Sequence, residues 1–168
     1  MRDFFDRLLA KWEQAGERLP RAPWDPDVDD RIWQGPPVDG WAPWRPLEKT
    51  VRHDLAELAP DLGSLHSSLD DYFNAWWFCQ LEGLLDPHVV MLEAVLPGME
   101  VESFLDVARG YRDAHQGILR HVPIGVEAEG LQVVVDNASG EVSIEDWERG
   151  TFEPLALSLS ELIRRLEP

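Results

Sequence analysis

Cysteine, long apolar runs and, over most of the chain, basic residues are scarce in this sequence. Cys79 is the only cysteine, so a disulfide within the chain is excluded, and its apolar surroundings predict a small core residue rather than a reactive thiol. The longest apolar runs, such as residues 75–79, fall far short of the roughly 20 residues that span a bilayer. Residues 1–16 contain acids and no small-residue cleavage site, which argues against a signal peptide. Together these absences predict a soluble cytoplasmic protein.

The shortage of basic residues gives the chain a strong negative charge. There are 15 Lys and Arg residues against 32 Asp and Glu, for a formal net charge of −17. Neither residues 53–108 nor residues 121–148 contain a Lys or an Arg. Such a surface repels nucleic acid and anionic lipid headgroups, and it attracts basic partners most strongly at low salt. The charge therefore predicts a basic protein partner and no nucleic-acid partner, although solubility alone is the simpler interpretation.

The apolar content is that of a folded domain. Hydrophobic residues make up 44% of the chain, with eight Trp and six Phe, which is enough for one domain spanning residues 1–168. Phe5, Leu8 and Trp12 recur at helical spacing and predict a helix over residues 2–15. Residues 19–46 contain seven Pro and four Trp, which predicts an irregular but ordered segment that wraps on the body. A sugar-binding groove is an alternative use of those tryptophans.

Residues 1–46 are thus predicted to form a helix and a wrapping segment, and residues 47–168 an α+β body. In the body the patterns predict helices at 47–58, 101–116 and 159–166, and strands at 74–82, 88–95, 119–126, 132–136 and 141–145. Ser158 and Glu161 form a capping box at the start of the last helix. We therefore expect a single α+β domain in which helices pack on a mostly antiparallel sheet of about five strands.

The hairpin at residues 132–150 is the most informative stretch. The turn NASG predicts that Asp136 and Asn137 bond the turn backbone and that Gly140 has a positive φ. The turn resembles a calcium loop only superficially, because Ala138 and Gly140 stand where oxygen donors would be needed. After the turn, Val142 and Ile144 alternate with acids, which predicts that Glu141 and Glu145 face outward together.

No motif points to catalysis, a metal or a cofactor. The five histidines lack ligand spacing, and His53 and His115 are predicted to be surface or packing residues. A Gly-rich phosphate loop and a GxSxG motif are both absent, and Ser139 has no local base. Pairs of acids suited to a glycan hydrolase can be chosen from the 32 carboxylates, but no spacing selects one pair. The prediction is a protein that is not an enzyme, with an unrecognised enzyme as the alternative.

The last 38 residues, from LQVVVDNASGEVSIED to the closing LALSLSELIRRLEP, resemble the C-terminal signature of the Syd family, the bacterial SecY-interacting proteins. In that signature a strand ends in Asn, a Ser-Gly-Glu-Val turn follows, and a leucine-rich helix closes on Leu-x-Pro. The matching positions, with a looser upstream set among them, include Trp44, Pro46, Glu48, Tyr72, Asp136, Asn137, Ser139, Gly140, Glu141, Val142, Glu145, Gly150, Leu155, Ala156, Ser158, Leu159, Leu162, Leu166 and Pro168. One departure is that residues 150–154 lack the basic side chains that the family tends to have there.

The resemblance implies a compact, non-catalytic protein of the wider SUKH superfamily that binds SecY through an acidic concave groove. Its partner would be the Lys- and Arg-rich cytoplasmic loops of the channel, and its role would be to monitor or regulate the SecY complex. It would be cytoplasmic and peripheral on the inner membrane, held there only by its protein partner, and its self-repulsion favours a monomer. Because the superfamily also includes immunity proteins, an immunity protein that neutralises a basic toxin, or another acidic adaptor, is the alternative.

Eight acids are candidates for the groove. They are Asp70, Asp71, Glu82, Glu93, Glu127, Glu129, Glu141 and Glu145. The sequence leaves open whether the groove is built by residues 70–93, by the hairpin, or by both.

Overall fold

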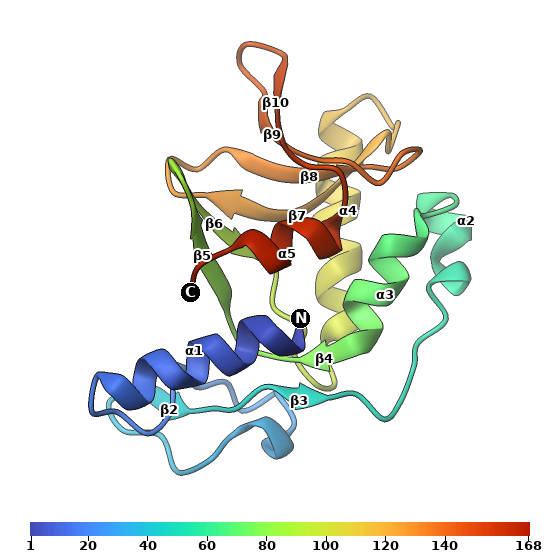
Figure 1. Cartoon of the computed structure of the whole chain (residues 1–168). Coiled ribbons are helices and arrows are strands. Elements are labelled where there is room, and N and C mark those ends of the chain that lie inside the picture. Colours follow the sequence, from blue (N-terminus) through green and yellow to red (C-terminus); the bar gives the residue numbers. More distant parts are fainter.

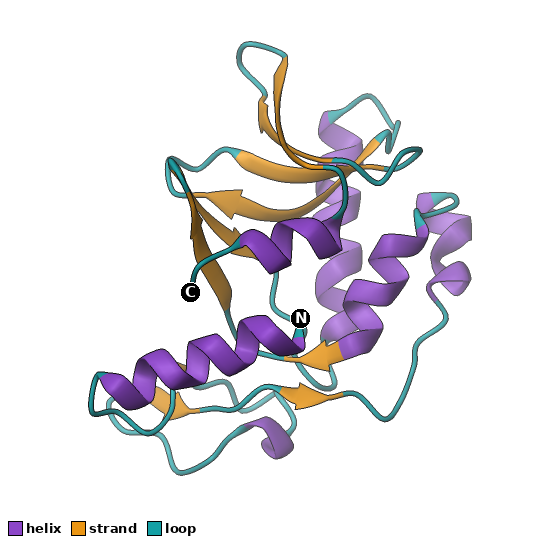
Figure 2. Cartoon of the chain, viewed as in Figure 1, coloured by secondary structure: helices purple, strands orange, loops and turns teal.

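A six-stranded antiparallel sheet forms the centre of the structure, a computed structural model that describes residues 1–168 (Figures 1 and 2). Its strands are β5 (Leu81–Leu85), β6 (His88–Leu92), β7 (His121–Glu127), β8 (Gln132–Asp136), β9 (Val142–Asp146) and β10 (Thr151–Ala156), and neighbours in sequence are neighbours in the sheet. The sheet is curled. At the usual strand spacing, β6 and β10 would be about 19 Å apart in a flat sheet, yet Nε2 of His88 is 3.0 Å from Oε1 of Glu153.

Helices cover both faces of this sheet. They are α1 (Arg2–Gln14), α2 (Ala59–Leu62), α3 (Ser67–Ala75), α4 (Glu100–Ala114) and α5 (Leu159–Arg165). Two small ladders, β1 (Arg21–Pro23) with β2 (Trp41–Pro43) and β3 (Leu47–Glu48) with β4 (Trp76–Trp77), and 3-10 turns at Asp30–Ile32 and Leu55–Leu58 complete the chain. In Figure 1, α5 lies in front of the strands and α4 behind them. The predicted α+β single domain is confirmed, with six strands in its main sheet because β10 was not predicted.

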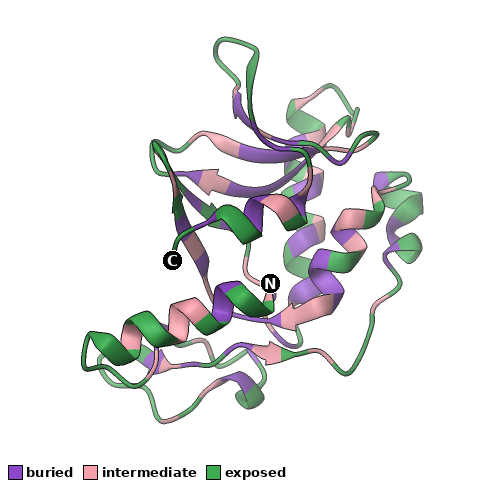
Figure 3. Cartoon of the chain, in the orientation of Figure 1, coloured by how far each residue is buried: buried purple, intermediate pink, exposed green.

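One core cluster joins the sheet to buried residues of α1, α3, α4 and α5. Val133 and Val135 of β8 and Val142 and Ile144 of β9 are at most 2% exposed, as their alternation predicted. The predicted capping box is present, since the Ser158 hydroxyl accepts the Glu161 N–H at 3.2 Å. Figure 3 shows the exposed residues on the outer sides of the helices and at the tip of the β9–β10 hairpin. None of the helices combines the length and the apolar character that a bilayer crossing requires.

The Pro- and Trp-rich segment is ordered but buries its tryptophans unequally. Trp44 is fully buried and Trp33 partly so, whereas Trp24 and Trp41 are 40% and 49% exposed. The segment buries its smaller residues instead, among them Ala22, Val28, Ile32 and Ala42. Core packing therefore explains Trp44 but not all four tryptophans.

Two predicted elements are wrong. Residues 47–58 are not a helix: β3 is followed by irregular chain and a 3-10 turn, because Leu47 and Glu48 pair with β4 instead. Pro60 lies in the first turn of α2, a position where its missing N–H costs nothing. Residues 74–82 are not one strand, because α3 continues to Ala75 and β4 and β5 are separate. The helical spacing of Leu69, Tyr72 and Phe73, all buried, fixes α3.

The turn between β8 and β9 is seated on the segment before α3. Asp136 accepts the N–H groups of Ala138 and Ser139 at 2.8 Å, and Gly140 has φ +80°, both as predicted. Asn137 differs from the prediction, because it bonds another segment rather than its own turn. Its Oδ1 accepts the His66 N–H and its Nδ2 donates to the Ser64 carbonyl, each at 2.7 Å. A Cβ on residue 140 would also overlap the imidazole of His66. The positive φ and this close contact each favour glycine at position 140.

Replacing Asn137 with Ala should therefore lower the free energy of unfolding by about 1–3 kcal/mol, because two long-range hydrogen bonds are lost together. Ser139→Ala is the matched control in the same turn, since the Ser139 hydroxyl bonds only within the turn, to the Glu141 N–H and to Asp136. Urea denaturation monitored by circular dichroism measures both. Equal losses for the two variants would contradict an anchoring role for Asn137.

Candidate functional site

The eight candidate acids differ in burial and in their contacts. Asp71, Glu93, Glu129 and Glu141 are exposed, Asp70 and Glu82 are half-buried, and Glu127 and Glu145 are buried. Glu82 and Glu145 share one row across the sheet, which runs through Met91, Val126 and Gln132. They lie four strands apart in the order of the sheet. Glu82, Glu127, Glu145 and Asp70 each contact a different set of neighbours, so the acids are described by those contacts.

One group surrounds His88, and we call it the His88 group: His88, Glu127, Glu129 and Glu153. The imidazole lies between two carboxylates, 3.0 Å from Glu153 and 3.7 Å from Glu127. Glu127 also accepts the N–H of Glu129 at 2.7 Å. Glu153 was not among the candidates, because only the curl of the sheet brings β10 to β6. This group combines two of the candidate acids, Glu127 and Glu129, with a third carboxylate, that of Glu153.

Glu145 lies in a different place from the one predicted. It is 4% exposed, and its carboxylate accepts the Tyr111 hydroxyl at 2.6 Å and contacts Nε2 of His115 at 2.9 Å. The prediction that it faces outward with Glu141 is wrong, because α4 covers the face of β9 that the alternation assigned to solvent. Burial, reinforced by the hydrogen bond to Glu145, raises the pKa of Tyr111 well above its usual range.

Asp70 is held within the fold by neighbours on both sides. Its carboxylate pairs with Arg52 at 2.7 Å and accepts the Asn74 amide at 2.9 Å. Asn74 is 4% exposed and also makes two hydrogen bonds to the backbone of His53. Asp71, the next residue, is free of such contacts and faces solvent.

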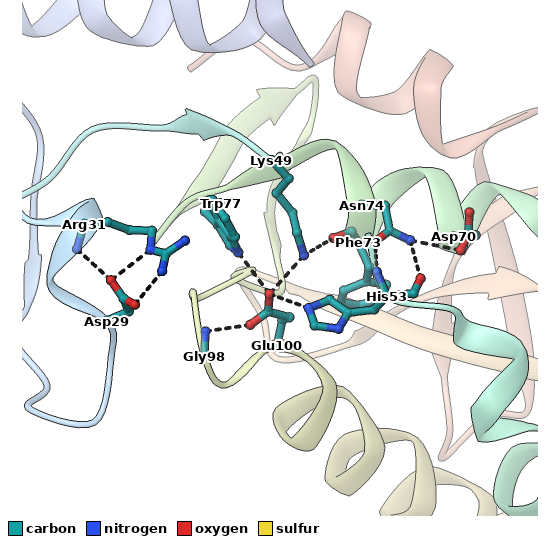
Figure 4. A network of polar contacts seen from close by, with 10 residues as sticks. All are labelled: Asp29, Arg31, Lys49, His53, Asp70, Phe73, Asn74, Trp77, Gly98 and Glu100. Carbon is teal, nitrogen blue, oxygen red and sulfur yellow. Dashed lines mark hydrogen bonds and ion pairs between the residues drawn. The ribbon is translucent and has the colours of Figure 1, made fainter. Parts of the chain in front are cut away.

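The most extensive polar network was missed by the sequence analysis (Figure 4). Oε1 of Glu100 accepts from Nζ of Lys49 at 3.0 Å, from Nε1 of Trp77 at 2.9 Å, and lies 2.9 Å from Nε2 of His53. Oε2 of Glu100 accepts the Gly98 N–H at 2.8 Å. Burial alone would raise the pKa of Glu100, but these hydrogen bonds lower it to about 2.

This network is structural. The side chain of Lys49 is fully buried and that of Glu100 is 5% exposed, so the carboxylate is enclosed by donors from separate parts of the chain. Lys49 also donates to the Phe73 carbonyl at 3.0 Å. No spacing in the sequence links these residues, and no signal there could have found them.

The upstream residues of the family resemblance are also mostly structural. Trp44 is fully buried and Pro46 is buried beside it. The Tyr72 hydroxyl donates to the Glu93 carbonyl at 2.6 Å. Glu48 is exposed and pairs with Arg2 at 2.6 Å.

Burial raises the pKa of the Cys79 thiol to about 12, which leaves it protonated and unreactive at neutral pH.

The fold and these groups define an acidic α+β domain whose buried ionic groups are paired and whose exposed carboxylates far outnumber its basic side chains.

Three curated relatives, all named "Protein Syd", are similar to this chain over nearly its whole length. The proteins of Aeromonas salmonicida (strain A449) and Aeromonas hydrophila are each 28% identical to it over 182 aligned residues, covering 96% of this chain and 93% of theirs. That of Psychromonas ingrahamii (strain DSM 17664) is 25% identical over 174, covering 99% and 92%. No protein-family model matches the chain. The relatives support the Syd family and extend the resemblance far beyond the C-terminal hairpin.

Proposed function

We propose that this protein binds the cytoplasmic loops of the SecY channel, without catalysis, and monitors or regulates the SecY complex. The observation that carries the proposal is the near-full-length similarity to proteins named Syd. Membership of the wider SUKH superfamily is part of the same proposal. The protein would be cytoplasmic and would reach the inner membrane only through this partner.

The electrostatics favour such a partner. Cytoplasmic loops of membrane proteins are rich in Lys and Arg, and this chain has a formal net charge of −17. Opposite charge accelerates encounter and suppresses association with acidic surfaces. The His88 group presents two exposed carboxylates, those of Glu129 and Glu153, together with the buried carboxylate of Glu127. We place the main contact there.

The test is the binding of purified protein to detergent-solubilised SecY complex and to a labelled peptide of one SecY cytoplasmic loop. We expect binding at low salt that weakens at least about tenfold between 50 and 300 mM salt, because the contacts are ionic and partly exposed. A loop peptide with its Lys and Arg replaced by Gln is the control and should not bind.

A complex that resists salt, or no complex with SecY at all, would contradict the proposal. Capture from host lysate separates the alternatives: a small basic soluble protein recovered in place of SecY would indicate the immunity or adaptor function instead.

A further inference from the structure

A cleft lies between α4 and the sheet, and the proposed function has not used it. It has a volume of about 400 Å³, and its apolar walls are Val107, Gly110 and Ala114 of α4 and Pro123 of β7. Polar side chains enter it from α4, β8 and β9, and no Lys or Arg lines it.

One side of the cleft is aromatic. The rings of Tyr111 and His115 are stacked with centroids 3.7 Å apart, and the ring of Trp147 meets His115 edge-on at 4.1 Å. Trp147, in the turn after β9, is 56% exposed. A large indole left in solvent beside two stacked rings is typical of a surface that receives another molecule.

Two carboxylates, those of Asp106 and Glu145, line the same cleft. Glu145 is 4% exposed and keeps acceptor positions beyond the two filled by Tyr111 and His115, since an ionised carboxylate has about four. Asp106, on α4, is exposed and has no basic side chain within ion-pair distance. Apolar walls, an exposed indole and unneutralised carboxylate form the arrangement that binds a cation on an aliphatic stem.

We propose that this cleft receives a Lys or Arg side chain of the protein partner. The aliphatic part of that side chain packs on Val107 and Ala114, the cation lies over Trp147, and the exposed carboxylate of Asp106 neutralises it. The inference rests on the proposed function only in taking the partner to be basic. It adds a side-chain-specific contact, on the α4 side of the sheet, to the exposed carboxylates of the His88 group.

The first experiment uses single side chains as probes. N-acetyl-arginine amide is titrated into the ¹⁵N-labelled protein, and the indole N–H signals of the eight Trp residues are followed by NMR, with Trp147→Phe assigning its own signal. We expect the Trp147 signal to shift with arginine and not with N-acetyl-citrulline amide, the neutral isostere, or with glucose. Equal shifts with citrulline, a response to the sugar, or no shift with arginine would each overturn the proposal.

The second experiment uses the labelled SecY-loop peptide and two variants. Trp147→Ala and Asp106→Asn should each weaken its binding by about tenfold. Glu148→Gln is the matched control: it removes one exposed negative charge next to Trp147 but outside the cleft lining, and it should change binding less than twofold.

The two proposals fail in different ways. If the peptide binds tightly and neither cleft variant matters, the cleft proposal is wrong and the proposed function stands. If arginine amide shifts Trp147 but neither SecY nor its loop peptide binds, the cleft is real and the proposed partner is wrong.

Discussion

Replacing Glu100 with Gln is expected to lower the free energy of unfolding by about 3–5 kcal/mol, because the charge of Lys49 is then buried without its counterion. The Lys49 side chain is fully buried, and its remaining acceptor is the Phe73 carbonyl at 3.0 Å. Domains of this size are typically stable by about 5–15 kcal/mol, so the loss is a large share of the total. Urea denaturation followed by circular dichroism measures it.

Two variants make this result interpretable. Glu48→Gln breaks the exposed pair with Arg2, whose side chains are 65% and 62% exposed, and should cost less than about 1 kcal/mol. The double variant Lys49→Met with Glu100→Gln should be more stable than Glu100→Gln alone, because no unpaired charge stays buried. A loss for Glu100→Gln no greater than that for Glu48→Gln would mean that Lys49 finds solvent when its partner is removed.

The same pair should also shape the acid stability of the protein. The pKa of Glu100 is lowered from 4.5 to about 2, so the unfolded state binds the proton more readily than the folded state. Its contribution is therefore complete above about pH 4.5 and is lost as the pH falls toward about 2. In the wild type this loss steepens acid unfolding over that window, and Glu100→Gln should show a shallower dependence there.

The sequence predicted an element correctly where its local apolar pattern agrees with the burial of its residues in the folded protein. The helix predicted over residues 101–116 is α4, the strand over 119–126 is β7, and the capping box of α5 is formed. In each case the local pattern alone is enough to predict the element. The alternating valines of β8, for example, predict that Val133 and Val135 face the core, and both are fully buried.

The sequence was insufficient where distant segments decide the environment. Leu47, Val51, Leu55 and Leu58 have helical spacing, but pairing with β4 and burial of Lys49 hold that segment extended at its start. These competing contacts are separated from residues 47–58 by about 20 residues or more, so periodicity within that window could not reveal them.

The surroundings of two acids could not be predicted for the same reason. Period-two alternation assigns Glu145 to one face of β9 but not the helix that covers that face. The curl that brings Glu153 to His88 is a property of the whole sheet, and no window of sequence contains it. Composition predicted an acidic surface, and only the fold shows which carboxylates share a place on it.

Reversing two acids of the His88 group, Glu129→Lys with Glu153→Lys, should weaken binding of the SecY-loop peptide by roughly 100-fold at low salt, because like charges then face each other across the contact. Both residues are exposed, so the variant should stay folded, which circular dichroism checks. Fluorescence anisotropy with the labelled peptide gives the dissociation constants.

The matched control is Glu13→Lys with Glu17→Lys, two exposed acids at the end of α1 and just beyond it. It changes the net charge by the same amount, from −17 toward −13, and so weakens long-range attraction equally. We expect it to change binding only a few-fold. Equal losses for the two double variants would mean that net charge alone attracts the partner. A loss confined to the Glu129 and Glu153 variant would mean that the curl of the sheet, by bringing β10 to β6, builds the binding surface.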